Sequence, residues 1–348
     1  MRAVGLLLLL CVLLIVLTFS VSGPRRAVRP GPGFTPTATA SVREAPADVP
    51  VPIRDFAESG VSVLLPSACL PGDGSYDVVI HFHGALNVMK AALSKSELNV
   101  ALLVVTVGEI SGDYADRYAP QGTLEWLLGR VERVVNAQCP LPNRRVRRLA
   151  LSAWSAGFAA VGALLRHPDV FARTDAVLLA DGLHAPLLTR SPRSLPPDSL
   201  ATFIAFAELA VAGKKLFAIT HSAIRTDTYA STTESADFLL SHLGLVRTRT
   251  ERPGPLPGMM LETTVERGGF SLEGYLGGDE RAHSQHLWGL GDTLFRRLRI
   301  HWAGAAVPAA STSAHVASGG PPVAVSVEVQ GNVTCTKSGS YVECRAEQ

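Results

Sequence analysis

The stretch Arg147–Arg166, RRLALSAWSAGFAAVGALLR, decides the fold prediction. An apolar run leads into a cluster of small residues around Ser155, and a second run rich in alanine, leucine and glycine follows. The first run is typical of a buried strand and the second of a packed helix. Ser155 is therefore expected at a sharp corner between a strand and a helix, which raises the question of why a hydroxyl is placed there.

Apolar runs alternate with helical patterns on both sides of this corner. Strands are expected at residues 76–84, 100–108, 146–153, 174–182, 214–222 and, as the last strand, 259–269. Helices are expected at residues 122–138, 159–168, 198–213, 231–244 and 282–300. Continuous apolar strands that alternate with helices indicate an α/β fold with a mostly parallel sheet flanked by helices on both faces.

The composition is that of a folded chain without a strong charge bias. Of the 348 residues, 47% are hydrophobic and 18% are charged, which is typical of a globular protein. The formal net charge of +2 arises from mixed signs, so no concentrated basic face and no nucleic-acid partner are expected. The sequence has no phosphate-binding loop, dinucleotide fingerprint or zinc-ligand spacing, so neither a cofactor nor a metal is expected.

Two stretches rich in proline, alanine and threonine divide the chain. Residues 23–52 and 303–322 lack hydrophobic periodicity and are interpreted as linkers. Between them, residues 53–302 are expected to form one α/β domain. Alternating valines in residues 323–348 predict a short β tail.

The amino-terminal residues 1–22 are almost wholly apolar after a short basic start, which is typical of a signal peptide or membrane anchor. The protein is therefore expected to be exported (secreted, periplasmic or membrane-anchored), with membrane contact only through these residues if they stay uncleaved.

Four cysteines outside this segment then suggest disulfides, for which three pairings exist. Cys335 and Cys344 flank a hairpin-like stretch, and the pairing of Cys69 with Cys139 follows by elimination. The alternative is four reduced thiols in a cytosolic protein.

The five residues around Ser155 suggest why a hydroxyl stands at the corner. A tight strand-to-helix turn crowds the positions two before and two after the serine, and these are the small residues Ala153 and Gly157. The text AWSAG resembles the G-x-S-x-G nucleophile elbow of the α/β-hydrolase superfamily, with alanine in the first glycine position. The resemblance implies that Ser155 is a nucleophile and that the N–H of Ala156 binds an oxyanion.

A second motif, HFHGA, ends the strand expected at residues 76–84. The loop after an early strand supplies the other oxyanion N–H in this superfamily, and His83-Gly84 resembles that loop. The resemblance implies that the N–H of Gly84 or Ala85 has this role. An alternative is that His81 and His83, two residues apart on one strand, form a metal pair, although no third ligand is nearby in sequence.

The superfamily's chain order is serine, then an acid, then histidine. His283 follows a glycine-rich loop and opens the last expected helix, where the family's histidine usually stands; His286, one turn later, is the alternative base. Asp181, at the end of a buried strand, is the preferred acid, because a charged group there needs a partner. Asp227, after the next strand, is the alternative acid and occupies the commoner location in the family.

These residues predict an exported serine hydrolase that cleaves an ester or amide of a small-molecule or acylated substrate through a Ser-His-Asp triad and an acyl-enzyme. Within this class, a serine esterase and an amidase or peptidase are not distinguished by any residue. The alternative from another class is a surface binding protein that keeps the hydrolase fold without activity.

Overall fold

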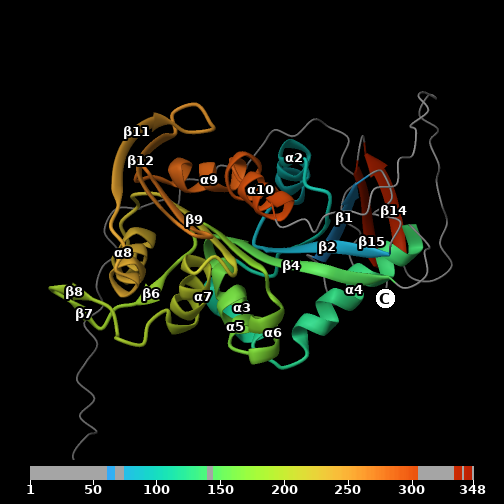
Figure 1. Cartoon of the computed structure of the whole chain (residues 1–348), viewed down its shortest axis with the longest axis horizontal. Helices are drawn as coiled ribbons and strands as arrows, with labels where there is room; N and C mark the ends of the chain where they lie inside the picture. The colour runs from blue at the N-terminus through green and yellow to red at the C-terminus, as the bar shows by residue number, and fades with distance from the viewer. Residues whose placement is uncertain (1–60, 67–73, 139–143, 305–332, 339–340, 347–348) are drawn as a thin grey trace, which may run out of the picture. The chain divides into compact units, whose positions relative to one another are not determined.

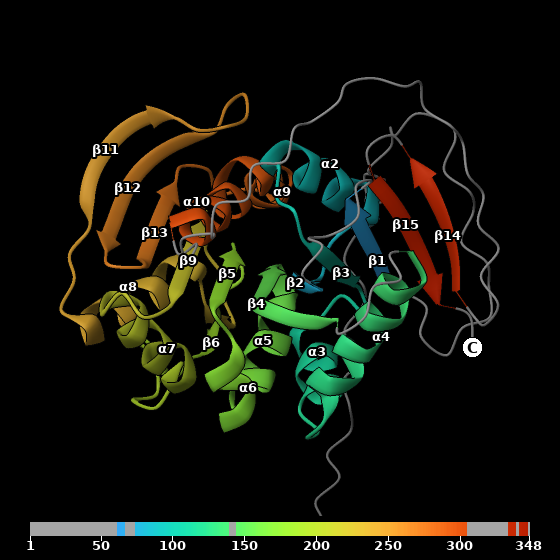
Figure 2. The same ribbon diagram turned by 45° about the vertical axis from the view of Figure 1, so that its right-hand side comes forward.

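The computed structural model describes residues 61–66, 74–138, 144–304, 333–338 and 341–346. Its main feature is an 11-stranded sheet with the order β11-β12-β13-β9-β5-β4-β2-β3-β1-β15-β14. The strands from β13 to β3 in this order pair in parallel, and the outer strands on both sides pair antiparallel. Figure 2 shows β11–β13 at one end of the sheet and β1, β15 and β14 at the other.

The main strands are β1 Val61–Pro66, β2 Ser75–Phe82, β3 Ala101–Val105, β4 Arg145–Trp154, β5 Ala176–Ala180, β9 Leu216–His221, β11 Thr248–Pro253, β12 Met260–Arg267, β13 Phe270–Tyr275, β14 Val333–Ser338 and β15 Tyr341–Ala346. The helices are α2 Leu86–Ser96, α3 Ser111–Tyr118, α4 Thr123–Gln138, α5 Phe158–Leu165, α6 Pro168–Arg173, α7 Ala201–Val211, α8 Thr232–Leu243, α9 Glu280–Trp288 and α10 Arg296–Gly304. A 3-10 turn, Ser155–Gly157, precedes α5, and a π-helical turn, Gly291–Phe295, joins α9 to α10.

Helices cover both faces of the sheet, as the alternation of strands and helices predicts (Figure 1). One face packs against α4, α5, α7 and α8, with Ile80, Leu151 and Leu179 among its strand residues. The other face packs against α2, α9 and α10, and Val79, Ala150 and Leu178 point to it. The central strands are thus apolar on both sides, because adjacent residues of a strand enter different cores.

Residues 259–269, expected as the last strand before the final helix, are followed by a further strand, β13. They correspond to β12, which pairs antiparallel with β13, and β13 is the strand that lies parallel to β9. The turn between them is Gly268-Gly269, where Gly268 has φ +58° and a Cβ would lie 2.3 Å from the Val211 carbonyl oxygen. The segment FSLEGY of β13 was missed because Glu273 and Gly274 interrupt its apolar pattern.

The carboxy-terminal tail forms a β-hairpin, β14–β15, and β15 pairs antiparallel with β1 at the edge of the main sheet. Cys335 and Cys344 are opposite each other in this backbone register. Their side chains, together with Cys69 and Cys139, lie outside the described part of the chain, so both disulfides stay predictions.

The expected signal or anchor, residues 1–22, and the linkers 23–52 and 303–322 also fall outside the described residues, apart from the end of α10. Within the described ranges, no helix combines the length and the apolar character needed to cross a bilayer.

Candidate active site

The corner at Ser155 is a strained turn between β4 and α5. Ser155 has φ +50°, in the left-handed region that a residue with a side chain rarely adopts. A Cβ at Gly157 would lie 2.3 Å from the Phe82 carbonyl oxygen, and one at Gly182 would lie 2.5 Å from the Ser155 carbonyl oxygen. Both glycines therefore let neighbouring backbone approach the turn, and of these two only Gly157 was expected from the sequence.

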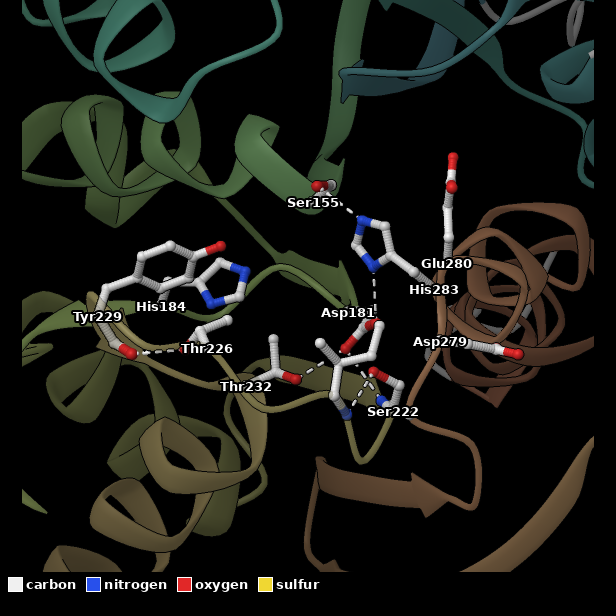
Figure 3. A pocket seen from close by; sticks show the side chains of 12 residues that line it. Ser155, Asp181, His184, Ser222, Thr226, Tyr229, Thr232, Asp279, Glu280 and His283 are labelled. Atoms are coloured by element: carbon white, nitrogen blue, oxygen red, sulfur yellow. Dashed lines mark hydrogen bonds and ion pairs between the residues drawn. The ribbon is translucent and has the colours of Figure 1, made fainter. Parts of the chain in front are cut away.

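Ser155, His283 and Asp181 form one hydrogen-bonded series (Figure 3). The Ser155 Oγ lies 2.8 Å from Nε2 of His283, and the other ring nitrogen, Nδ1, lies 2.7 Å from Oδ2 of Asp181. A carboxylate only accepts hydrogen bonds, so Nδ1 carries the proton and Nε2 is left to accept the serine hydroxyl hydrogen. This is the arrangement that a general base needs in order to activate a serine.

Asp181 follows β5 with φ +44°, and its side chain is buried. Besides His283, the backbone N–H of Ser222 and the hydroxyl of Thr232 donate to its Oδ1, at 2.9 and 2.7 Å. Burial by itself raises the pKa of this carboxyl, but the hydrogen bond from His283, the nearby imidazoles and the Ser222 N–H together hold the pKa well below its usual range. Asp181 is therefore ionised and oriented.

His283 is held from two sides. Asp279 is the N-cap of α9, where its Oδ1 accepts from the Ala282 N–H at 2.8 Å, and this fixes the first turn of the helix. The indole Nε1 of Trp154 donates to the His283 carbonyl at 3.1 Å, and the two rings lie 4.7 Å apart. His83 stacks on Trp154 at 5.0 Å, so Trp154 contacts both histidine rings. No role was expected for Trp154, and its place directly before Ser155 is the one signal for it in the sequence.

The alternative residues lie elsewhere. His286 is buried, and its Nδ1 lies 2.9 Å from the hydroxyl oxygen of Thr220 rather than near Ser155. Asp227 is exposed in the loop between β9 and the short strand β10, Tyr229–Ala230. Hence the structure brings His283 and Asp181 to Ser155, and the catalytic role of all three stays a prediction.

The N–H groups expected to bind an oxyanion belong to Ala156, Gly84 and Ala85. Ala156 lies in the 3-10 turn Ser155–Gly157 that precedes α5, and the first N–H groups of such a helical start have no carbonyl of a preceding turn to bond. The N–H of Gly84 lies 3.4 Å from Oγ1 of Thr106, which in turn donates to the Gly84 carbonyl at 2.8 Å. Ala85 is the N-cap of α2, and among the described residues its N–H has no partner. Ala156 and Ala85 are therefore the available donors.

The two histidines of the HFHGA motif have separate partners. His81 is buried, with Nδ1 2.9 Å from Oγ of Ser152. His83 has left the strand with φ +65°, and its Nδ1 lies 2.9 Å from the Tyr114 hydroxyl. Across the part of the chain that the structure describes, no three His, Cys, Asp or Glu side chains are grouped to hold a metal ion.

A cavity of about 280 Å³ opens beside Ser155 (Figure 3). Its walls come from the ends of β5 and β9, the loop before α8 and the start of α9, that is, from the carboxyl edge of the parallel strands where ligands bind in such sheets. The lining residues are Ser155, Asp181, His184, Ser222, Ile224, Thr226, Tyr229, Thr232, Gly278, Asp279, Glu280 and His283.

A partly buried contact with Arg247 fixes the tautomer of another histidine, His221. Nη1 of Arg247 donates to Nε2 of His221 at 2.8 Å, so Nδ1 of His221 carries the proton and donates to the Ser222 carbonyl at 2.9 Å. Burial, with the Arg247 cation, lowers the pKa of His221 to about 4. Burial likewise lowers the pKa of His286 to about 4.

These buried neutral histidines are expected to make the protein acid-sensitive. In the unfolded chain a histidine takes up its proton near pH 6.5, whereas folded His221 and His286 stay neutral down to about pH 4. The unfolded state therefore binds more protons in this window, and the free energy of unfolding falls as the pH falls. Between pH 7 and pH 4.5 each of these two histidines should lower the free energy of unfolding by about 2 kcal/mol.

Urea denaturation of the wild type, His286→Gln and His242→Gln at the two pH values measures this loss. Removing His286 should reduce the loss by about 2 kcal/mol, while removing the exposed His242 should leave it unchanged. Equal losses in the wild type and His286→Gln would contradict this, because they would mean that the folded protein takes up a proton on His286 at the same pH as the unfolded chain.

Comparisons with known proteins identify no family for the chain. No family model and no curated protein matches it. Solved structures that it resembles include a hydrolase from Oleispira antarctica (TM-score 0.35, 11% identity, 70% of this chain and 94% of that chain). They also include the thioesterase domain that cyclises the lipopeptide antibiotic surfactin (TM-score 0.30, 13% identity, 72% of this chain and 97% of that chain). A third is a type II thioesterase from the yersiniabactin pathway (TM-score 0.30, 13% identity, 70% of this chain and 98% of that chain).

The topology of the described residues itself identifies the fold. A mostly parallel sheet is flanked by helices, β4 enters a left-handed Ser155 turn before α5, and an acid and a histidine follow in that order along the chain. This architecture is that of the α/β-hydrolase fold, which the sequence around Ser155 resembles.

Proposed function

We propose that this protein is an exported serine hydrolase that cleaves a small ester through an acyl-enzyme on Ser155. The observation that carries the proposal is the unbroken series from Ser155 Oγ through His283 to Asp181 at the wall of a cavity. Export rests on the apolar residues 1–22 of the sequence. An amide substrate would use the same groups, and the cavity volume favours a small acyl group in either case.

The reaction follows from the roles of these groups. Ser155 Oγ bonds to the acyl carbon while its proton passes to Nε2 of His283, and the carbonyl oxygen takes the negative charge. The N–H groups of Ala156 and Ala85 bind this oxygen. His283 then gives the proton to the leaving oxygen as the carbon–oxygen bond breaks. Asp181 keeps Nδ1 protonated and stabilises the imidazolium throughout.

Water completes the cycle by the same route. A water molecule gives one proton to His283 as its oxygen bonds to the acyl carbon, and the proton returns to Ser155 Oγ as the acyl–serine bond breaks. These steps need only the chain's own residues and water. The reaction therefore turns an ester and water into an acid and an alcohol.

The test is hydrolysis of p-nitrophenyl esters of increasing acyl length by the full-length protein. A cavity of about 280 Å³ lies just below the usual range for ligand pockets, which is about 300 to 1,000 Å³. Acetate and butyrate esters should therefore be cleaved at least about tenfold faster, as kcat/KM, than laurate or palmitate esters. A folded protein that cleaves none of them would favour the alternative, a binding protein with a hydrolase fold.

A further inference from the structure

The cavity wall contains a second histidine, His184, which the proposed reaction does not use. Figure 3 shows His184 and Tyr229 on one side of Ser155 and His283 on the other. The His184 ring meets Phe158 of α5 edge-on, with 5.5 Å between ring centroids, and meets Tyr229 edge-on at 5.0 Å. Contacts from two directions hold this ring in one orientation at the pocket.

The hydrogen bonds of His184 decide which nitrogen is free. Ala185–Pro186 (β6) and Tyr229–Ala230 (β10) pair as two short strands, which brings Nδ1 of His184 to 3.3 Å from the Ala230 carbonyl oxygen. A carbonyl only accepts, so Nδ1 carries the hydrogen. Burial lowers the pKa of His184, which keeps the ring neutral at neutral pH. The lone pair therefore lies on Nε2.

No described residue donates a hydrogen bond to this Nε2, although the ring lines the cavity. A neutral imidazole nitrogen with a lone pair is an acceptor, and a ligand with an O–H or N–H group can satisfy it. Ligands that lack a donor would leave the nitrogen without a partner once water is displaced, which costs binding free energy.

The charges around the cavity exclude one class of ligand. Its described lining contains no lysine or arginine, whereas the carboxylates of Asp279 and Glu280 both contribute to it. Oδ1 of Asp279 is engaged with the Ala282 N–H, and Glu280 is exposed at the wall. A carboxylate or phosphate on the substrate would meet the like charge of these two carboxylates, so neutral or ammonium donors fit this wall better.

We infer that His184 selects small esters whose acyl group carries a hydroxyl or N–H donor, which bonds to its Nε2. This rests on the proposed function and assigns a substrate class to the same site. The leaving oxygen must face His283, which returns a proton to it. The acyl group therefore extends toward the other side of Ser155, where His184 and Tyr229 lie.

The experiment compares two esters that differ by one hydroxyl, p-nitrophenyl lactate and p-nitrophenyl propionate, each corrected for its uncatalysed rate. The wild type should favour the lactate ester about tenfold in kcat/KM, the value expected for one neutral hydrogen bond. His184→Phe keeps a ring between Phe158 and Tyr229 and removes the acceptor, so the ratio should fall to about 1. His184→Gln retains an acceptor and should keep part of the preference.

The control is His242→Phe, which changes an exposed histidine away from the cavity and should leave the ratio at its wild-type value. Thermal melting shows that each variant is folded. The p-nitrophenyl ester of succinic acid, which adds a carboxylate, should be cleaved more slowly than the propionate ester. A wild-type ratio near 1, or the same ratio in the wild type and His184→Phe, would overturn the role of His184.

A separate measurement distinguishes this inference from the proposed function. If the wild type cleaves the propionate and lactate esters with equal kcat/KM, the hydrolase proposal stands and the inference fails. If no ester is cleaved, nuclear magnetic resonance titration can measure how tightly Ser155→Ala binds methyl lactate and methyl propionate. This comparison still decides the inference. Tighter binding of methyl lactate than of methyl propionate to Ser155→Ala supports the inference if the double variant Ser155→Ala/His184→Phe loses this difference. Equal binding of the two esters to Ser155→Ala overturns it.

Discussion

Ser155→Ala is expected to lower kcat for ester hydrolysis by at least about 10⁴-fold while the protein stays folded. Without Oγ no acyl-enzyme can form, and His283 has no hydroxyl to deprotonate at that position. Ser155 is only partly buried at the cavity, so losing one oxygen should change the free energy of unfolding by less than about 0.5 kcal/mol. Single-turnover kinetics with a short p-nitrophenyl ester and urea denaturation measure the two effects separately.

Ser284→Ala is the matched control for this substitution. Ser284 stands next to His283 on α9, is partly buried and does not line the cavity. Its removal should leave kcat within about twofold of the wild type. A folded Ser155→Ala protein that retains more than a tenth of the wild-type kcat would show that another group attacks the ester.

Asp181→Asn is expected to cost about 10³- to 10⁴-fold in kcat. The asparagine oxygen can still accept from the Ser222 N–H and Thr232, which turns the amide nitrogen, a donor, toward Nδ1 of His283. His283 must then carry its proton on Nε2, where it cannot accept the serine proton. The negative charge that stabilises the imidazolium is lost as well.

Asp227→Asn distinguishes the two acids that the sequence offered. Its side chain is exposed in the β9–β10 loop, so this variant should keep kcat within about threefold of the wild type. The pH–rate profiles of both variants should be recorded, because loss of the acid partner of the base changes the shape of the profile, whereas a loss of packing does not. A large loss in Asp227→Asn with a small one in Asp181→Asn would reverse the assignment of the acid.

The sequence alone predicts the layers of the fold and the position of the turn. Ser155 stands between an apolar strand and a small-residue helix, and local crowding requires small residues at 153 and 157, so the turn can be read from five residues. Asp181 was a candidate because it ends a buried strand at the edge where parallel strand ends meet, and His283 because it opens the last helix after a glycine-rich loop.

Other features depend on contacts between distant segments. His286 has the same local setting as His283, and only the packing of α9 against β9 places His286 beside Thr220 and His283 beside Ser155. Trp154 and Gly182 have no motif of their own, since their roles arise from close approach to His283 and Ser155. The polar β13 was missed for a similar reason, because pairing with β9 and β12 outweighs its weak strand pattern.

The central claim is that His283 and Asp181 make Ser155 a nucleophile at the cavity. The most direct measurement is reaction of the full-length protein with a fluorophosphonate probe, followed by peptide mapping by mass spectrometry, with Ser155→Ala and His283→Ala run in parallel. A single adduct on Ser155 that is absent from both folded variants is the expected result. An unlabelled wild type, or equal labelling of Ser155 in His283→Ala, would contradict the claim.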